Sequence, residues 1–337
     1  MAEVSIAILG LGRVGTSVGL ALKRHNMQGK EHQFTITGYD GTPDNVKEAK
    51  TLGAIDESAG RPEIATQNKD IVLMALPYGE VRTAYEYIAP SLRSGVVILD
   101  TSPICQTSLD WSKEFLPKDA HVVCIRPIVN SAYVFDGVDE GKRAKEDMFD
   151  GGTILMMPSV TCIPEAISLA TDFTKLLGAT PHFTDPAEHD GLIAGMDILP
   201  DLLGTAYFHM LSRNSGWTDL QRLGNPAFGM ATHPLFDTHP DDLRDSFLNS
   251  GDNLVRYLDG MIEELREFRT ALATQDRDAL EAALGDASKQ YERWINRRVN
   301  NKWQGDEMLD SNTSSVGGMM SNMMGGFFGG RNKNDDD

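Results

Sequence analysis

The chain has 337 residues, 41% hydrophobic and 24% charged, an ordinary balance for a protein long enough to form two domains. Its formal net charge of −18 predicts a surface that repels nucleic acids and anionic membranes. Three scattered cysteines, Cys105, Cys124 and Cys162, exclude a disulfide framework and a zinc site, so no metal is expected. No apolar run approaches the ~20 residues of a membrane span, and no leader precedes the first predicted strand, so a cytoplasmic location is expected.

The beginning of the chain reads as a strand, a tight turn and a helix. The apolar residues 4–9 lead into a G-x-G-x-x-G sequence, after which Val14, Val18 and Leu22 recur at helical spacing. In this motif the first glycine permits the turn, the second lets backbone approach a pyrophosphate, and the third lets the helix pack on the strand. The phosphates would bind N–H groups at the start of the helix. The predicted cofactor-binding residues of this turn are Gly10, Leu11, Gly12, Arg13, Val14 and Gly15.

A carboxylate follows the second apolar run. Residues 34–39 end at Asp40, about where a ribose-binding acid belongs in a dinucleotide-binding unit. Asp40 would accept hydrogen bonds from a ribose diol and repel a 2′-phosphate, which favours NAD, with NADP left as the alternative cofactor. A surface turn with an unrelated aspartate would also contain these residues. The preceding strand, the following helix and the distance to the acid favour the dinucleotide site.

Further buried strands alternate with helical segments. They are predicted at residues 70–76, 95–100, 121–125 and 153–157. Such alternation predicts a doubly wound parallel sheet, whose ligand crevice lies beyond the carboxyl ends of the strands. The segments expected beside the glycine-rich turn are therefore 76–79, 100–103 and 126–130, with Leu76 and Pro77 contacting the cofactor.

Beyond Pro186, long helical patterns replace the strands, at residues 188–213, 240–274 and 276–299. The prediction is an α/β protein with a Rossmann-type dinucleotide-binding domain over residues 1–180 and an all-α substrate and dimerisation domain over residues 181–305. A homodimer through the apolar stripes of these helices is expected, although internal packing would produce the same stripes. The low-complexity tail, residues 306–337, is rich in Gly, Met and Phe and is predicted to be disordered.

The order of these motifs resembles the prephenate and arogenate dehydrogenase family. The resemblance spans residues 4–298 and implies oxidative decarboxylation of prephenate or arogenate with NAD or NADP, in tyrosine biosynthesis. In that reaction a hydride leaves the ring carbon bearing the hydroxyl, the hydroxyl loses its proton, and loss of CO2 aromatises the ring. The motifs that carry it are the glycine-rich turn with Asp40, Leu76-Pro77, Asp100-Thr101-Ser102, Arg126-Pro127, Gly178-Ala179, Glu188-His189-Asp190, Ile198-Leu199-Pro200 and Phe247-Leu248-Asn249.

The substrate half departs from the family's pattern. Arg126 stands where the family has its proton-accepting histidine, and residues 197–201 read Asp-Ile-Leu-Pro-Asp in place of Ser-His-Leu-Pro-His. No arginine stands near His233, where the family has one that would clamp a ring carboxylate. Two alternatives therefore stay open. One is a dehydrogenase of the same architecture acting on another hydroxy acid, and the other is an inactive dinucleotide-binding sensor or scaffold.

Three residues are the candidates for catalysis on a small carboxylate substrate. Arg126 would bind a carboxylate bidentately, unless it forms a structural ion pair. Ser102 would hydrogen-bond a substrate hydroxyl or else cap a turn. His189, which precedes an aspartate, would act as an oriented base or else belong to a helix cap. Asp197 and Asp201 share a helix face that points to the crevice or, as is usual for helical carboxylates, to solvent.

Overall fold

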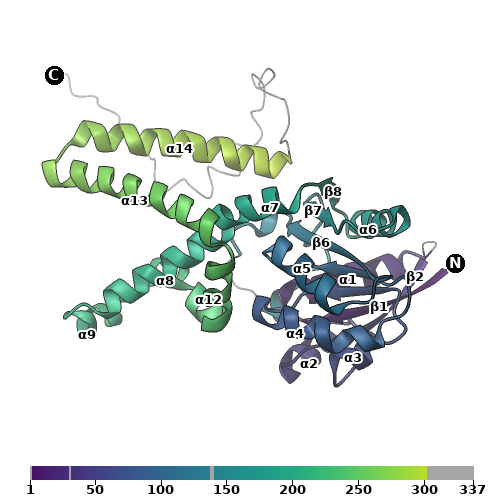
Figure 1. Cartoon of the computed structure of the whole chain (residues 1–337). Helices are drawn as coiled ribbons and strands as arrows, with labels where there is room; N and C mark the ends of the chain where they lie inside the picture. The colour runs from purple at the N-terminus through teal and green to yellow at the C-terminus, as the bar shows by residue number, and fades with distance from the viewer. Residues whose placement is uncertain (1, 30–31, 137–139, 302–337) are drawn as a thin grey trace, which may run out of the picture. The chain divides into compact units, whose positions relative to one another are not determined.

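The computed structural model describes residues 2–29, 32–136 and 140–301. The first half of the chain forms a sheet flanked by helices (Figure 1). Within the described residues the sheet has eight strands in the order β3-β2-β1-β4-β5-β6-β7-β8. The strands are β1 (Ala2–Leu9), β2 (His32–Tyr39), β3 (Glu57–Ser58), β4 (Ile71–Met74), β5 (Val97–Asp100), β6 (His121–Ile128), β7 (Thr153–Pro158) and β8 (Thr180–Phe183). The helices are α1 (Arg13–Met27), α2 (Pro43–Thr51), α3 (Pro62–Ala65), α4 (Tyr78–Ile88), α5 (Cys105–Phe115) and α6 (Pro164–Leu176).

Both faces of the central strands are buried, because successive side chains of a strand point to opposite faces. In β1, Ile6 and Ile8 belong to the core that includes residues of α1 and α6, whereas Ala7 and Leu9 belong to the core that includes residues of α4 and α5. Helices thus cover two sides of one sheet, which is the predicted doubly wound Rossmann arrangement.

Among the described strands, β7 and β8 run opposite to the other six. β6 and β7 pair antiparallel, from Val123 opposite Pro158 to Ile128 opposite Thr153, while the remaining pairs are parallel. The described parts of the connection between these two strands contain only two short 3₁₀ turns, η2 (Ser131–Tyr133) and η3 (Gly141–Arg143). A parallel neighbour needs a crossover that returns the chain to the same starting edge, usually a helix. The sheet is therefore mostly parallel, where the sequence pattern predicted a fully parallel one.

The remainder of the chain is helical, as predicted. The expected helix over residues 188–213 is divided in two by η4, a five-residue π-helix. Pro200 lies in the first turn that follows, where its missing N–H leaves no hydrogen bond unmade. The elements are α7 (Pro186–Ile193), η4 (Ala194–Ile198), α8 (Leu199–Ser212), α9 (Trp217–Leu220), α10 (Pro226–Thr232), α11 (Pro234–Asp237), α12 (Pro240–Asn249), α13 (Gly251–Thr274) and α14 (Arg277–Asn300).

The chain divides into two compact units, residues 1–267 and 268–337. In the first unit, an apolar cluster joins the helical segments to the sheet half. Its buried members are Tyr78, Ile104, Ile193, Ile198, Leu199 and Leu254. The helices that follow β8 are therefore anchored beside the starts of α4 and α5.

The second unit contains the end of α13 and all of α14. Asp276 begins α14 by accepting a hydrogen bond from the backbone N–H of Ala279 at 3.0 Å. The tail predicted to be disordered, residues 306–337, lies outside the described residues. Across the helices that the structure describes, none combines the length and apolar composition needed to cross a bilayer.

Candidate active site

The glycine-rich turn follows β1 and has two positions that admit no side chain. Gly10 has φ +91°, and a Cβ there would lie 2.1 Å from the carbonyl oxygen of Ala75. A Cβ on Gly15 would lie 1.9 Å from the carbonyl oxygen of Gly10. Gly12 is different, because a Cβ there would meet no protein atom within 4 Å. Its missing side chain leaves open space at the start of α1.

That open space faces a helix end suited to an anion. Gly12 is the N-cap of α1 and makes no side-chain capping bond, and the first turn contains no acidic residue. The helix is 15 residues long, so its first N–H groups and its dipole present positive potential there. A phosphate group fits this end, because the first turn of α1 holds no carboxylate of its own. The turn is therefore suited to the pyrophosphate of a dinucleotide.

Asp40 is held against the same turn. Its carboxylate accepts hydrogen bonds from the backbone N–H groups of Leu11 and Thr42, each at 2.7 Å, and from the Asn45 amide at 3.2 Å. Burial raises the pKa of Glu80, and the charges of Asp242 and Asp40 raise it further. The end of β2 thus lies in a negative local field.

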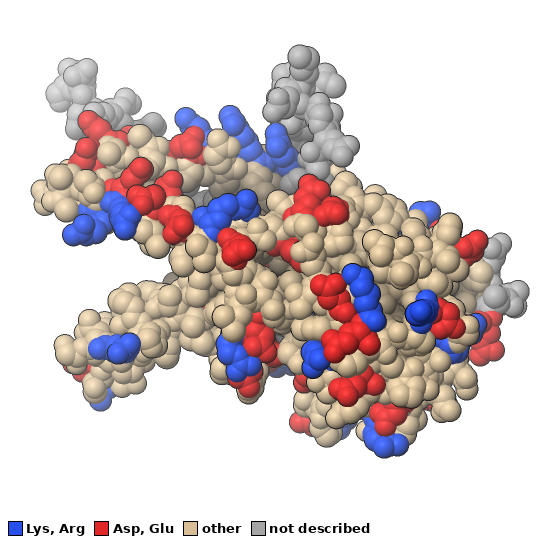
Figure 2. Space-filling view, in the orientation of Figure 1, with Lys and Arg blue, Asp and Glu red and all other residues tan. Residues whose placement is uncertain are grey.

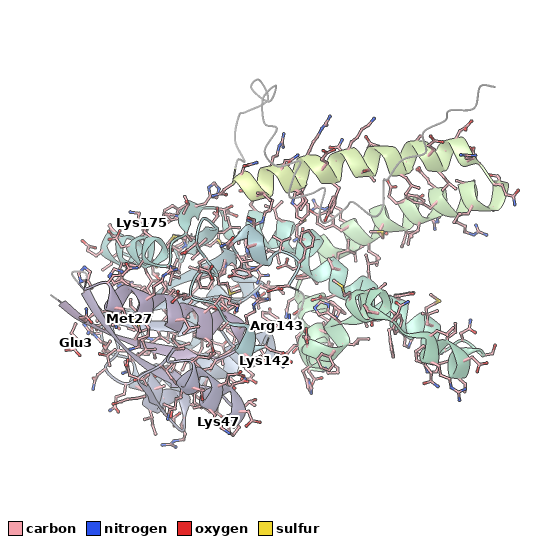
Figure 3. The ribbon with its side chains drawn as sticks, turned by 180° about the vertical axis from the view of Figure 1, so that it is seen from behind. Glu3, Met27, Lys47, Lys142, Arg143 and Lys175 are labelled. Atoms are coloured by element: carbon pink, nitrogen blue, oxygen red, sulfur yellow. The ribbon has the colours of Figure 1, made fainter. Side chains whose placement is uncertain are left out.

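Arg13, also predicted to bind the cofactor, makes a protein contact. Its guanidinium is buried and donates hydrogen bonds to the carbonyl and carboxylate oxygens of Asp136, at 2.9 and 3.0 Å. It also lies 5.8 Å from the centre of the Tyr133 ring. These contacts fasten the β6–β7 connection to the glycine-rich turn. Later in the same connection, η3 packs against α1 and α2 (Figure 3, where Lys142 and Arg143 are labelled).

The other predicted crevice residues lie on the same edge of the sheet. The strand register aligns Leu9, Met74, Asp100 and Cys124 in one row across β1, β4, β5 and β6. Residues that come after this row lie at the carboxyl edge. Val14 and Leu76 are half-buried there, Pro77 is exposed, and Ser102 and Arg126 are each two residues beyond the row. The structure therefore brings Ser102 and Arg126 to the edge that holds the glycine-rich turn.

Ser102 belongs to a buried hydrogen-bond network. Its backbone N–H and its hydroxyl both donate to Asp100 Oδ1, at 2.9 and 2.7 Å. Asp100 is fully buried, and its Oδ2 accepts from the hydroxyls of Tyr85, at 2.7 Å, and of Ser108. Burial, followed by the charge of Asp100, raises the pKa of Tyr85 well above its ordinary value. Because the Ser102 proton is directed to Asp100, the lone pairs of its oxygen are what it can offer to another group.

Arg126 forms an ion pair with Asp197 of the π-helix η4. The side chains are 28% and 36% exposed, so the pair lies at the surface of the crevice edge. π-Helical segments occur frequently at functional sites, because the extra residue in the turn re-aims the side chains around it. Here the π-helix places a carboxylate against the strand-end arginine and compensates its charge.

Asp201 is the group that sequence reasoning left undecided between crevice and solvent. It lies in the first turn of α8 and is only partly exposed. Burial raises its pKa to about 6, and the nearby positive charges of His233 and Arg126 oppose that increase. Gly204 explains the nearness of His233, because a Cβ on this glycine would lie 2.5 Å from the carbonyl oxygen of Ala231. The close approach brings the segment just before α11 against α8.

His189 is fully buried. Its Nδ1 lies 2.9 Å from Asp190 Oδ1. Asp190 also accepts the backbone N–H groups of Cys105 and Gln106, at 2.8 and 2.9 Å. This carboxylate therefore completes the start of α5 and holds α7 against it. In the parts of the chain that the structure describes, no group of three or more His, Cys, Asp or Glu side chains is placed to hold a metal ion.

Comparison with known proteins finds dehydrogenases that are similar to this chain in sequence. Residues 18–182 match the family model "Prephenate dehydrogenase, nucleotide-binding domain". The chain is 25% identical over 277 residues to cyclohexadienyl dehydrogenase of Zymomonas mobilis, which covers 82% of this chain and 90% of that protein. It is also 25% identical over 280 residues to prephenate dehydrogenase of Bacillus subtilis, which covers 82% of this chain and 72% of that protein.

Solved structures show the same fold. Prephenate dehydrogenase from A. aeolicus, crystallised with hydroxyphenyl propionate and NAD+, superposes with a TM-score of 0.70 at 19% identity, covering 87% of this chain and 99% of that one. Arogenate dehydrogenase from Synechocystis superposes with a TM-score of 0.61 at 17% identity, covering 86% of this chain and 99% of that one. The chain is therefore similar to prephenate dehydrogenases in the sequence of residues 18–182, to two dehydrogenases over 82% of its length, and to solved prephenate and arogenate dehydrogenases in fold.

Proposed function

We propose that this enzyme is an NAD-dependent dehydrogenase that oxidises and decarboxylates prephenate or arogenate. The observation that carries the proposal is the uncapped start of α1 at Gly12, on the sheet edge that also holds Ser102 and Arg126. When bound, the oxidised nicotinamide would accept the hydride. The residues that would hold the dinucleotide are Gly10, Leu11, Gly12, Arg13, Val14, Gly15, Asp40, Leu76 and Pro77, with Arg13 acting through its contact with Asp136.

NAD is the proposed cofactor in preference to NADP. Asp40 is fixed at the end of β2 by the Leu11 and Thr42 N–H groups, which leaves it at the expected ribose position. Glu80 adds negative charge in the same region. A 2′-phosphate would be repelled by both carboxylates, whereas a ribose diol would donate to Asp40.

The three candidate residues take different proposed roles. Arg126, oriented by Asp197, would bind a substrate carboxylate. Ser102 would accept a hydrogen bond from the substrate hydroxyl, because its own proton is directed to Asp100. His189 would position α7 against α5 through Asp190, or serve as a base if the substrate reaches its Nε2.

We also propose that residues 1–180 form the dinucleotide-binding domain, and that residues 181–305 form the substrate domain and pair two copies in a homodimer. Large apolar side chains are exposed on the helical segments of the first unit, and the end of α8 with α9 carries few charged residues in Figure 2. These exposed apolar side chains support an interface between two copies through the helical segments. The exposed residues include Met210, Leu223, Met230, Phe236 and Leu248.

The test is formation of reduced nicotinamide, followed by its absorbance, with prephenate or arogenate and with NAD or NADP. Turnover with NAD and one of these substrates is the expected result. If folded protein that binds NAD is silent in all four combinations, the proposed reaction is wrong. Turnover on another hydroxy acid would then support a dehydrogenase with a different substrate. The absence of turnover on any hydroxy acid would support a sensor or scaffold. Light scattering on the purified protein tests the homodimer.

A further inference from the structure

The proposed reaction needs a group that accepts the proton of the substrate hydroxyl. Arg126 cannot accept one near neutral pH, because its guanidinium stays protonated. Ser102 already directs its hydroxyl proton to the buried Asp100. A proton acceptor therefore has to come from the helical segments that face these strand ends.

We propose that Asp201 accepts the hydroxyl proton and that His233 passes it on to solvent. The inference rests on the proposed dehydrogenase function and names a residue for its proton transfer. Asp201 follows Asp197 across the junction of η4 and α8, and the charge of Arg126, which pairs with Asp197, also acts on Asp201, so both carboxyl groups lie on the face near Arg126. Since Asp197 contacts Arg126 at the end of β6, that face is turned toward the carboxyl edge of the sheet.

Packing places His233 at Asp201. Gly204, one turn after Asp201 in α8, lies against residues 231–234. A Cβ on this glycine would lie 2.5 Å from the carbonyl oxygen of Ala231 and 3.5 Å from Cδ of Pro234. His233 Nε2 lies 3.5 Å from Asp237 Oδ2, and its side chain is 41% exposed. An imidazole that faces a partly buried carboxylate on one side and solvent on the other can carry a proton between them.

The charges around Asp201 balance so that it can both hold and release a proton. Burial favours the protonated form of Asp201, whereas Arg126 and, whenever its ring is protonated, His233 favour the ionised form. Asp197 compensates Arg126, and Asp237 faces His233, so neither cation acts on Asp201 alone. The resulting pKa of about 6 suits a general base near neutral pH, since efficient proton acceptors titrate close to the working pH.

The step balances with the groups already named. Asp201 takes the hydroxyl proton, the O–H electron pair becomes the second bond of the carbonyl, and the hydride leaves the carbinol carbon for the oxidised nicotinamide. Loss of CO2 would then move the electron pair of the broken C–C bond through the ring to the carbonyl oxygen, which takes up a proton from water to give the phenol. The proton on Asp201 moves to His233 and to water, which restores the carboxylate for the next turnover.

The experiment compares the wild type with Asp201→Asn, Asp201→His and the exposed control Asp219→Asn, using prephenate and arogenate with NAD. Each variant is first checked for its melting temperature. The rate of hydride transfer and kcat/KM are measured from pH 5 to 9, and the Asp201 carboxyl is titrated by ¹³C NMR in the protein alone. We expect Asp201→Asn to lose at least about a hundredfold in rate together with the wild-type limb near pH 6, as for removal of a general base.

Asp201→His should recover part of the rate with a pH limb of its own, and Asp219→Asn should match the wild type. The inference is overturned if Asp201→Asn keeps the rate and the pH limb, or if it only raises the KM for arogenate, which would make Asp201 a binding site for the substrate ammonium. It is also overturned if the NMR titration lies near the ordinary aspartate value. If the wild type turns over neither substrate, the proposed function fails, and this inference fails with it.

Discussion

The proposed nucleotide half and the proposed substrate half of this chain differ in how their functional groups are held. At the glycine-rich turn, the site consists of backbone and empty space, set by local contacts such as that between Gly15 and the Gly10 carbonyl. At the opposite side of the crevice, side chains from distant elements compensate one another, as Arg126 and Asp197 do. Backbone sites tolerate little change in sequence, whereas a set of mutually compensating charges can be exchanged as a group.

The sharpest test of the first half is the pair Gly15→Ala and Gly12→Ala. A methyl group on Gly15 would overlap backbone, so we expect a loss of about 3 to 5 kcal/mol in unfolding free energy, measured by denaturant titration. A methyl group on Gly12 meets no protein atom, so stability should stay nearly unchanged while NAD affinity falls at least tenfold by calorimetry. Equal unfolding free energies for the two variants would contradict the conclusion that only Gly15 is packed against backbone.

The contact between the two halves is tested by Asp190→Ala. This change leaves the Cys105 and Gln106 N–H groups and the His189 ring without their shared acceptor, which should cost about 3 kcal/mol of stability. Asp110→Ala, on the exposed face of α5, is the matched control and should change stability by less than about 0.5 kcal/mol. A large loss of kcat in Asp190→Ala without a loss of stability would instead support His189 as the base.

The substrate half should show a pH dependence of stability that comes from Asp201. Its folded pKa, about 6, is above the ordinary 3.8, so the fold favours the protonated form. The stabilisation is fully present below about pH 4 and is lost as the pH rises through 6. Between pH 4 and 8 the wild type should therefore lose on the order of 2 to 3 kcal/mol relative to Asp201→Asn, measured by urea unfolding. Parallel stability curves for the two proteins would rule out a raised pKa.

The smallest expected effect concerns cofactor choice. Asp40→Ala removes the carboxylate that would bind the ribose diol and repel a 2′-phosphate. The ratio of NAD to NADP affinity should fall about tenfold, equivalent to about 1.4 kcal/mol. Asp44→Ala, an exposed acid in the first turn of α2, is the control. An unchanged ratio in Asp40→Ala would remove Asp40 from the proposed ribose site.

The sequence was informative where structure is local. The turn at Gly10 and Gly15, the strand before it and the acid at Asp40 are all features of one short segment, and the fold has them where the sequence pattern predicted. The direction of β7 could not be predicted, because it depends on which strand the chain pairs with after a long connection. The surroundings of Asp201 could not be predicted either, because they depend on a contact between Gly204 and the backbone of Ala231, which is far along the chain. A helical carboxylate is usually solvated, and only this packing makes Asp201 an exception.

The π-helix at residues 194–198 gives the crevice a particular vulnerability. A π-turn contains one residue more than the α-turn that it interrupts, so it arises or disappears through insertion or deletion of a single codon. Removing one residue there would restore an ordinary α-turn and leave α8 in nearly the same phase, because the π-turn accommodates one extra residue without rotating the helix that follows. Asp201 would then keep its direction, whereas the side chains within the π-turn, including Asp197, would be redirected. The partner of Arg126 therefore depends on the local helix type as well as on residue identity.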